Sequence, residues 1–232
     1  MIIKSLQMTM GIEAHRRAKP YNMGTLYWQL NDCWPAISWS SIDYFGNWKA
    51  LQYKAKKSFE NVLISSRIKN DTIKTYVIND TFEGVQDDLQ LKLQDFNGNV
   101  VWSKTQKINI NANSSQKFHQ LPINRFDKQN LVLVAKFNEN TSFFYLDKPK
   151  NLNLLKGEIS RTITRNKEGF KIILKSIVLQ KDIFLYSEER GHFSDNYFDL
   201  LPNEEVVIQF KTETETLNSL KIKTLNNTSP KE

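Results

Sequence analysis

Hydrophobic positions near the start of the chain follow a helical spacing. They recur at intervals of three and four residues, at Ile3, Leu6, Met10 and Ala14. Four cations between His15 and Lys19 suit the negative end of a helix dipole. Pro20 then ends the pattern, so the sequence predicts a helix over residues 1–20 with these apolar side chains on one face.

The next segment changes to a short apolar run. Leu26–Leu30 reads as a buried strand, residues 31–47 as an irregular stretch, and residues 48–61 as a second helix with Leu51, Ala55 and Phe59 on its apolar side. Helix, buried strand, loop and helix are typical of parallel α/β architecture. A parallel strand needs neighbours on both edges, and the chain offers no second such strand. Residues 1–61 are therefore expected to be the last part of an α/β domain.

From Val62 onward the period of the pattern becomes two. Leu89, Leu91 and Leu93 alternate with polar residues, and Asn97-Gly98 supplies a hairpin turn before the return over Val100–Ile110. Further strands are expected over residues 65–70, 74–79, 131–138 and 142–146. Short strands without intervening helices predict an antiparallel sandwich over residues 62–148.

A second series of strands follows a polar linker at residues 147–151. Strands are expected over residues 159–164, 170–176 and 183–187, and the alternation of Val206, Ile208 and Phe210 predicts one more. These elements predict a second sandwich over residues 149–232. The polar tail, Asn226–Glu232, is expected to fray.

Composition narrows the class of protein. The 232 residues are 40% hydrophobic and 25% charged, which is ordinary for a soluble protein. No apolar run is long enough to cross a membrane, and the first residues lack the pattern of a signal peptide. We expect a soluble protein without a membrane partner, periplasmic or cytoplasmic if the source is bacterial. The single cysteine, Cys33, excludes a disulfide framework, and it is expected to be buried.

Charge and motifs argue against several function classes. The net charge is +7, but the lysines are scattered along the chain, so no nucleic-acid partner is expected. His15, His119 and His192 lie in three different segments without ligand spacing, which argues against a metal site. No glycine-rich nucleotide motif occurs, so no cofactor is expected.

The segment from Gly24 to Phe59 contains GTLYWQLNDCWP, then SWSSIDYFG, then WKALQY. It resembles the β-mannosidases of glycoside hydrolase family 2 at the end of their catalytic barrel. Asn79-Asp80, Asp95–Gly98 and Ser194–Glu205 extend the resemblance over nearly the whole chain. The resemblance implies a mainly β multidomain chain. It would hold the terminal strand and helices of a (β/α)8 TIM barrel (residues 1–61), followed by two immunoglobulin-like antiparallel β-sandwiches (62–148 and 149–232).

The resemblance also implies an activity. Family enzymes are retaining exo-glycosidases that remove terminal β-D-mannose from oligosaccharides with two glutamates about 5–5.5 Å apart. Those glutamates lie on earlier barrel strands, so none of the catalytic residues is expected in this chain. Glu13 and Glu60 fall in predicted helices, and the loop carboxylates Asp32 and Asp43 lack a pocket that could shift their pKa. The isolated chain is expected to be inactive without the missing upstream barrel region as its partner.

Four residues are candidates for binding the substrate. Trp28 is expected at the floor of the mannose subsite, where an indole face covers a pyranose, with barrel core as the alternative. Asn31 and Asp32 suit hydroxyl recognition and loop capping equally. Trp34 either lines the substrate channel or packs the loop. Trp39, Tyr44 and Trp48 are expected to pack between barrel and helix.

Two other functions compete with this interpretation. An exo-β-glucosaminidase of the same family has a similar segment, although WQLND at residues 28–32 favours a mannosidase. A non-catalytic sandwich that binds carbohydrate or protein would display an exposed row of aromatic side chains. The candidates for such a row are Trp102, Phe118, Phe143, Phe144 and Tyr145.

Overall fold

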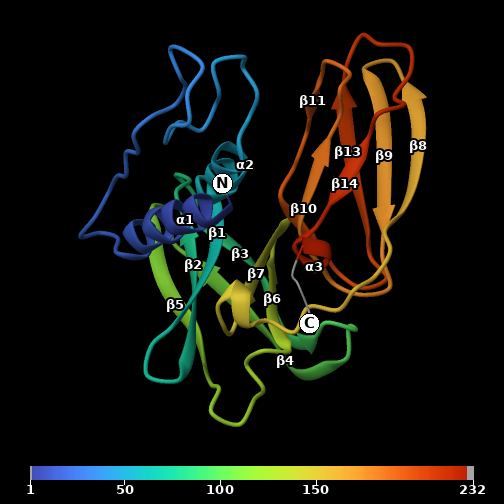
Figure 1. Ribbon diagram of the computed structural model, residues 1–232. Helices are drawn as coiled ribbons and strands as arrows, with labels where there is room; N and C mark the ends of the chain where they lie inside the picture. Colours follow the sequence, from blue (N-terminus) through green and yellow to red (C-terminus); the bar gives the residue numbers. More distant parts are fainter. Residues whose placement is uncertain (1, 229–232) are drawn as a thin grey trace. The chain divides into compact units, whose positions relative to one another are not determined.

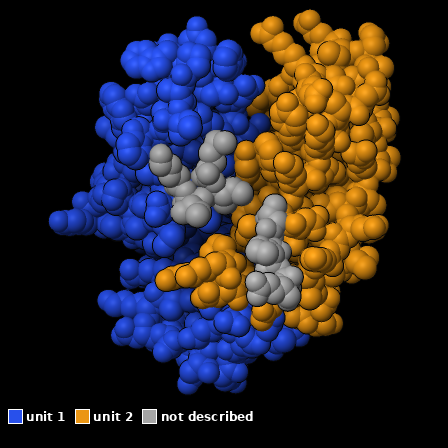
Figure 2. Space-filling view, viewed as in Figure 1, with its two compact units in different colours: residues 1–93, 100–147 blue, residues 94–99, 148–232 orange. Residues whose placement is uncertain are grey.

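The computed structural model describes residues 2–228 and consists mainly of antiparallel strands (Figure 1). The chain divides into two compact units (Figure 2). The first holds the residues up to Leu93 together with Val100–Asp147, and the second holds Gln94–Asn99 and the residues from Lys148 onward. The N-terminal helices and the first sandwich thus belong to one compact unit, while the domain boundaries predicted from the sequence stay predictions.

Two helices open the first unit. Helix α1 spans Ile2–Arg17 and helix α2 spans Ala50–Ser58, and the two lie side by side (Figure 1). Both predicted helices are confirmed, but the predicted apolar face of α1 is wrong. Met10 is 69% exposed, whereas Ile12 and Arg16 are buried. The inward face of α1 carries the buried Arg16, which contacts Ser58, Glu60 and Asp80.

The predicted buried strand at Leu26–Leu30 is also wrong. Among the described residues of this segment the backbone is irregular, Leu26 is fully exposed and Leu30 is 56% exposed. A parallel strand is stable only between neighbouring strands, and the described residues provide none at this place. Only isolated bridges join Ile42 to Asn31 and to Trp48. The described residues form no (β/α)8 barrel, and the barrel part of the fold stays a proposal.

Two sheets form the first sandwich. One has the order β1-β2-β5 and the other the order β4-β3-β6-β7. The strands are β1 (Val62–Ile68), β2 (Thr72–Asn79), β3 (Val85–Asp95), β4 (Val100–Ile110), β5 (Ser114–Pro122), β6 (Leu131–Phe137) and β7 (Asn140–Tyr145). Their inward side chains make one core that includes Ile64, Val77, Leu91, Leu133 and Phe137. The predicted mainly antiparallel sandwich is confirmed.

Turn chemistry sets the register of this sandwich. Asn70 and Asp71 both adopt positive φ between β1 and β2, which matches the two-residue hairpin turn that fits the right-handed twist of strands. At the predicted Asn-Gly turn, Gly98 has φ +94° and the Asp95 carboxylate accepts the N–H groups of Asn97 and Asn99. The sequence therefore encodes both hairpins locally.

The second unit is built in the same way. Its sheets have the orders β11-β13-β9-β8 and β12-β10-β14. The strands are β8 (Ser160–Asn166), β9 (Gly169–Lys175), β10 (Gln180–Tyr186), β11 (His192–Phe193), β12 (Phe198–Leu200), β13 (Glu205–Lys211) and β14 (Lys221–Lys223), with a 3-10 turn η1 (Pro149–Asn151) before them and helix α3 (Leu225–Thr228) after them. Ile172, Ile183, Leu200 and Ile208 are fully or almost fully buried in its core.

Several elements were not predicted. Strands β5, β11, β12 and β14 are polar or very short, so their hydrophobic pattern is weak. The prediction that the tail frays from Asn226 onward is wrong at Asn226 itself. Asn226 is buried, and its amide donates to the carbonyls of Leu155 and Leu179 at 2.8 and 2.7 Å. Residues 229–232 of the predicted tail lie outside the described residues.

Candidate functional site

The segment between α1 and α2 carries most of the exposed aromatic side chains of the chain. It forms long loops that extend beyond the two helices (Figure 1). Exposed large apolar residues on it include Tyr21, Leu26, Trp28, Leu30, Trp34, Ile37, Trp39, Tyr44 and Phe45. The prediction that Cys33 is buried is wrong, since it is exposed. Trp39 and Tyr44 are exposed as well, and their packing between barrel and helix stays a prediction because the described residues form no barrel. Trp48 is half-buried and meets Tyr53 edge-on at 5.2 Å.

The two tryptophans predicted to meet substrate are both on the surface. Trp28 is 78% exposed and Trp34 is 70% exposed, so neither is a core residue of the described structure. The peptide bond between Trp28 and Gln29 is cis. Next to Trp28, the Tyr27 hydroxyl lies 3.0 Å from the Ser41 hydroxyl, which fixes one side of the backbone while the indole stays free.

Asp32 points into its own loop. We call Asp32, Ser38, Ser40 and Lys49 the Asp32 cluster. The Ser38 hydroxyl donates to Oδ1 of Asp32 at 2.5 Å, and Oδ2 accepts from the Ser40 hydroxyl at 2.7 Å and from Lys49 Nζ at 2.8 Å. The Asp32 side chain is 4% exposed. Hydrogen bonds from Lys49, Ser38 and Ser40 lower the pKa of Asp32 to about 2, because they stabilise the charged form.

Backbone hydrogen bonds also join the two sides of the loop around Asp32. The N–H groups of Ser41 and Ile42 donate to the Leu30 carbonyl, and the Asp32 N–H donates to the Ile42 carbonyl. Asn31 lies beside this pairing with an exposed side chain, and its amide donates to the Asp32 carbonyl at 3.3 Å. The structure thus brings Asn31 and Asp32 together but gives them different surroundings: Asn31 faces outward and Asp32 is enclosed.

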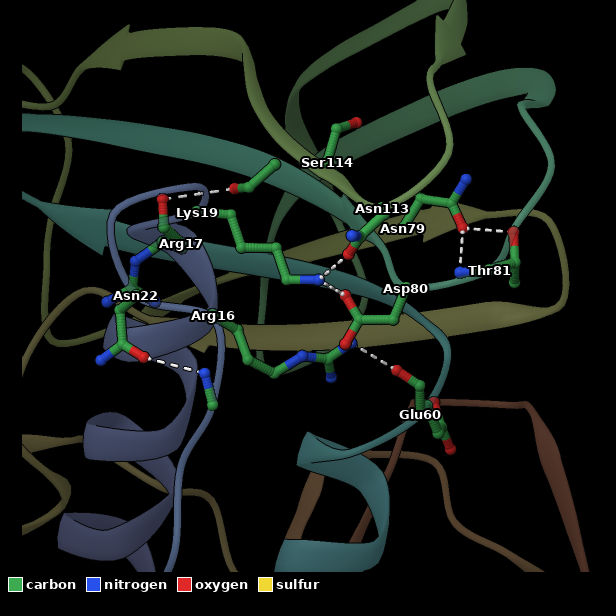
Figure 3. A network of polar contacts seen from close by, with 12 residues as sticks. Arg16, Arg17, Lys19, Asn22, Glu60, Asn79, Asp80, Thr81, Asn113 and Ser114 are labelled. Carbon is green, nitrogen blue, oxygen red and sulfur yellow. Dashed lines mark hydrogen bonds and ion pairs between the residues drawn. The ribbon is translucent and has the colours of Figure 1, made fainter.

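A second polar network fastens helix α1 to the first sandwich (Figure 3). Arg16 and Lys19 converge on the Asp80 carboxylate, at 3.1 Å from Arg16 Nη2 and 2.6 Å from Lys19 Nζ. Arg16 also donates to the carbonyls of Ser58 and Glu60. The Arg16 side chain is only 6% exposed. This network ties the end of α1 both to the end of α2 and to the residue after β2.

The neighbouring Arg17 makes a similar attachment. It donates to the Ser65 hydroxyl on β1 and lies 3.5 Å from Glu13 Oε2, to which Ser65 donates at 2.5 Å. Burial raises the pKa of Glu13 against the opposing effects of Ser65 and Arg17. Charged side chains of helix α1 therefore contact strand β1 at Ser65 and the residue after β2 at Asp80, and Ile12 of the same helix is buried.

The described residues contain no group of three or more histidine, cysteine, aspartate or glutamate side chains that could hold a metal ion. No helix within residues 2–228 is long and apolar enough to span a membrane. The aromatic row expected of a binding module is absent from the described sandwich faces. Its five candidates are half-buried, and Trp102, Phe118 and Phe144 pack against the first core.

Comparison with protein families addresses the two sandwiches. The family described as Mannosidase Ig/CBM-like domain matches residues 71–151. An Ig-fold domain family of mannosidases matches residues 154–228. Each match therefore falls on one of the two series of strands.

Relatives and a solved structure extend the similarity to the N-terminal segment. Beta-mannosidase A of Aspergillus terreus is 27% identical in an alignment 213 residues long, which covers 81% of this chain and 23% of the relative. The β-mannosidase of Capra hircus is 29% identical over 78% of this chain and 22% of its own. The crystal structure of a β-D-mannosidase from Dictyoglomus thermophilum aligns over 95% of this chain and 28% of that one, with a TM-score of 0.85 and 25% identity. The chain matches the C-terminal portion of the family 2 β-mannosidases.

The chain spans about a quarter of the length of the curated β-mannosidases it matches. A more distant structural neighbour is the exo-chitosanase CsxA of Amycolatopsis orientalis, with a TM-score of 0.74 and 17% identity over 96% of this chain. At that identity the likeness concerns the fold alone.

Residues missed from the sequence are important for the geometry of this β-mannosidase segment. Ser38, Ser40 and Lys49 complete the Asp32 cluster, and Arg16, Lys19 and Asp80 connect α1 to the sandwich. Helical spacing places Lys49 on the polar side of the predicted second helix, and spacing alone does not reveal that its side chain turns back toward Asp32. A carboxylate followed by several serines within one loop was the available signal.

Proposed function

We propose that this chain serves as the C-terminal portion of a retaining exo-β-mannosidase that hydrolyses terminal β-D-mannose residues of oligosaccharides. Its role is to complete the sugar-binding end of the barrel and to carry the two supporting sandwiches. We place the two catalytic glutamates of such an enzyme in a barrel region that would precede residues 1–61, so this chain would supply none of the catalytic residues.

The observation that carries this proposal is the exposure of Trp28 and Trp34 on an ordered loop. An indole offers a flat apolar face to the C–H face of a pyranose, and a ring held on an ordered backbone loses little entropy on binding. Both indoles are accessible, while bonds at Tyr27, Leu30 and Asp32 hold the backbone around them. We assign Trp28 to the floor of the mannose subsite and Trp34 to its wall.

Asn31 and Asp32 have different roles in the proposed subsite: Asn31 binds sugar hydroxyls, and Asp32 holds the loop. The exposed Asn31 amide has donors and an acceptor to offer to sugar hydroxyls. Asp32 already accepts three hydrogen bonds from its cluster, so its contribution to substrate binding runs through the loop that it holds together. Both carboxylate oxygens are occupied within the loop itself.

The barrel that precedes this segment in the relatives is the proposed partner of residues 1–61. Apolar side chains of the loop and of α1, among them Leu26, Ile37 and Met10, are largely exposed. Surface of this kind is costly in water and marks a place where another structure packs. Docking of the preceding barrel strands would bury it and would give Leu26–Leu30 the strand neighbours that it lacks here.

Activity assays test the proposal directly. The 232-residue chain is assayed with an aryl β-mannoside, alone and joined to the N-terminal region of a related β-mannosidase that this chain does not match, with an aryl β-glucosaminide as the competing substrate. Turnover of the mannoside by the joined protein alone is expected. Preference for the glucosaminide would favour the exo-β-glucosaminidase alternative, and turnover by the chain alone would refute the assignment of the catalytic glutamates to the upstream region.

A further inference from the structure

The segment of residues 18–49, which carries the exposed aromatic side chains between α1 and α2, is called the aromatic loop. Lys49 lies where this loop meets helix α2. It is the residue directly before α2, and its N–H donates to the Ser41 carbonyl at 2.9 Å. Its side chain turns back over the loop and is 15% exposed. Lys49 therefore bonds to the loop through its backbone and through its side chain at once.

The ammonium group of Lys49 has an acceptor for each of its three N–H donors. Lys49 Nζ lies 2.8 Å from Asp32 Oδ2, 2.7 Å from Ser40 Oγ and 3.3 Å from Ser38 Oγ. An ammonium has three donors, and three acceptors surround it. These contacts join positions up to 17 residues apart, so a single side chain closes the loop.

Burial gives this contact more weight than a surface ion pair. Exposed pairs contribute little because water and salt screen them. Here the Asp32 side chain is 4% exposed and the lysine stem is largely covered. Removing the cation would leave an enclosed carboxylate with only hydroxyl donors, and a charge in that situation draws in water or a proton. Either response changes the backbone around Asp32, which is two residues from Trp34.

We propose that Lys49 is a positioning residue of the mannoside subsite, acting through Asp32 to hold the loop that presents Trp28, Asn31 and Trp34. This inference rests on the proposed function, since it concerns the same subsite. Lys49 itself does not touch the sugar. It sets the distance between the two indoles by fixing the backbone at Asp32, which lies between them, and at Ser41, whose N–H donates to the Leu30 carbonyl.

The test compares three variants in the joined, active protein. Lys49→Met keeps the apolar stem and removes the charge, whereas Lys49→Arg keeps the charge but replaces the compact ammonium by a planar fork. Lys56→Met is the matched control, because Lys56 is an exposed lysine on the same helix. For Lys49→Met we expect KM for the aryl β-mannoside to rise roughly tenfold with a smaller change in kcat, since misplaced binding groups weaken substrate capture. Lys49→Arg should recover part of the loss, and Lys56→Met should match the wild type.

A spectroscopic measurement on the 232-residue chain accompanies the kinetics. The indole N–H signals of Trp28 and Trp34 are assigned by Trp→Phe substitution, and Lys49→Met should move or broaden them while Lys56→Met leaves them in place. An active wild type together with unchanged KM and unchanged indole signals in Lys49→Met would overturn the inference and leave the proposed function standing. Absence of mannoside turnover by the joined wild type would overturn both.

Discussion

Arg16 Nη2 on helix α1 lies 3.1 Å from Asp80 Oδ2, at the residue that follows strand β2 (Figure 3). The guanidinium is almost fully enclosed, so its charge depends on this carboxylate and on the carbonyls of Ser58 and Glu60. Burial lowers the pKa of Arg16, and the attraction of Asp80 opposes that shift. Helix α1 is thus attached to the first sandwich through an enclosed ion pair, in addition to the contacts of Glu13 and Arg17 with Ser65.

Asp80→Asn should loosen this attachment. It removes the charge that balances Arg16 and Lys19 while keeping the size of the side chain, so two cations lose their common partner. Asparagine keeps one acceptor oxygen, but a hydrogen bond to a charged partner contributes about 1.5–3 kcal/mol, so the loss of the carboxylate charge should cost an amount of this order. We expect the urea midpoint of the first unit to fall accordingly, and amide exchange in α1 to accelerate.

Asp88→Asn is the matched control for this change. Asp88 is exposed on β3 and its substitution alters the net charge by the same amount. Equal effects of the two substitutions would mean that net charge, and not the Arg16 contact, governs stability. A fall in the midpoint without faster exchange in α1 would place the effect in the sandwich.

Hydrophobic period and turn chemistry were sufficient to predict the two sandwiches. Leu89, Leu91 and Leu93 alternate as expected and are fully buried, and the turn at Asn97-Gly98 forms where the dipeptide indicated. The failures have two causes. Leu26–Leu30 has the composition of a buried strand, but a strand needs neighbours that the local sequence cannot supply. Strand β5 lacks the pattern because most of its side chains are polar and only Leu121 among them is buried.

The candidate site was predicted in part. Trp28 and Trp34 were selected by residue type and by resemblance, and both prove accessible on the loop. Their roles in sugar binding stay predictions. The Asp32 cluster and the Arg16–Asp80 pair could not be predicted, because each joins residues whose proximity depends on how the chain folds back. Long-range polar contacts leave no period in the sequence.

Acid should release the aromatic loop within a defined pH range. The pKa of Asp32 falls from 3.8 to about 2 in the folded chain because the charged form accepts three hydrogen bonds. A depressed carboxyl pKa stabilises the fold fully above the unfolded value, and this contribution is lost as the pH falls through the folded value. The loop should therefore stay ordered near pH 4 and lose order between pH 3.8 and about 2.

Tryptophan fluorescence against pH measures this transition. Asp32→Asn cannot titrate, so it should abolish the transition and give an acid-like spectrum at neutral pH. Asp43→Asn, in the same loop, serves as the control, because Asp43 organises a separate turn through Asn47. An unchanged transition in Asp32→Asn would assign it to another carboxyl group.

Exposed apolar side chains of the loop should drive association of the isolated chain. Leu26 and Ile37 are fully exposed, and contiguous apolar surface is buried where a partner is available. The double substitution Leu26→Ser and Ile37→Ser should lower the apparent mass at high concentration, measured by light scattering after size exclusion. Phe82→Ser removes an equally exposed residue from the β2–β3 loop and should leave the mass unchanged. The same mass for all variants would locate the association elsewhere.

Trp28 should matter for binding and not for folding. Its side chain is 78% exposed, and surface substitutions of this kind usually change stability by at most about 0.5 kcal/mol. Trp28→Ala and Trp34→Ala should therefore leave the thermal midpoint of the chain almost unchanged. By contrast, Phe137→Ala removes a ring that is 1% exposed in the first core, and it should cost about 3–5 kcal/mol.

In the joined protein Trp28→Ala should raise KM for the aryl β-mannoside. A large loss of stability in Trp28→Ala would show that the indole is a packing residue in solution, and its assignment to the mannose subsite would then lose its support.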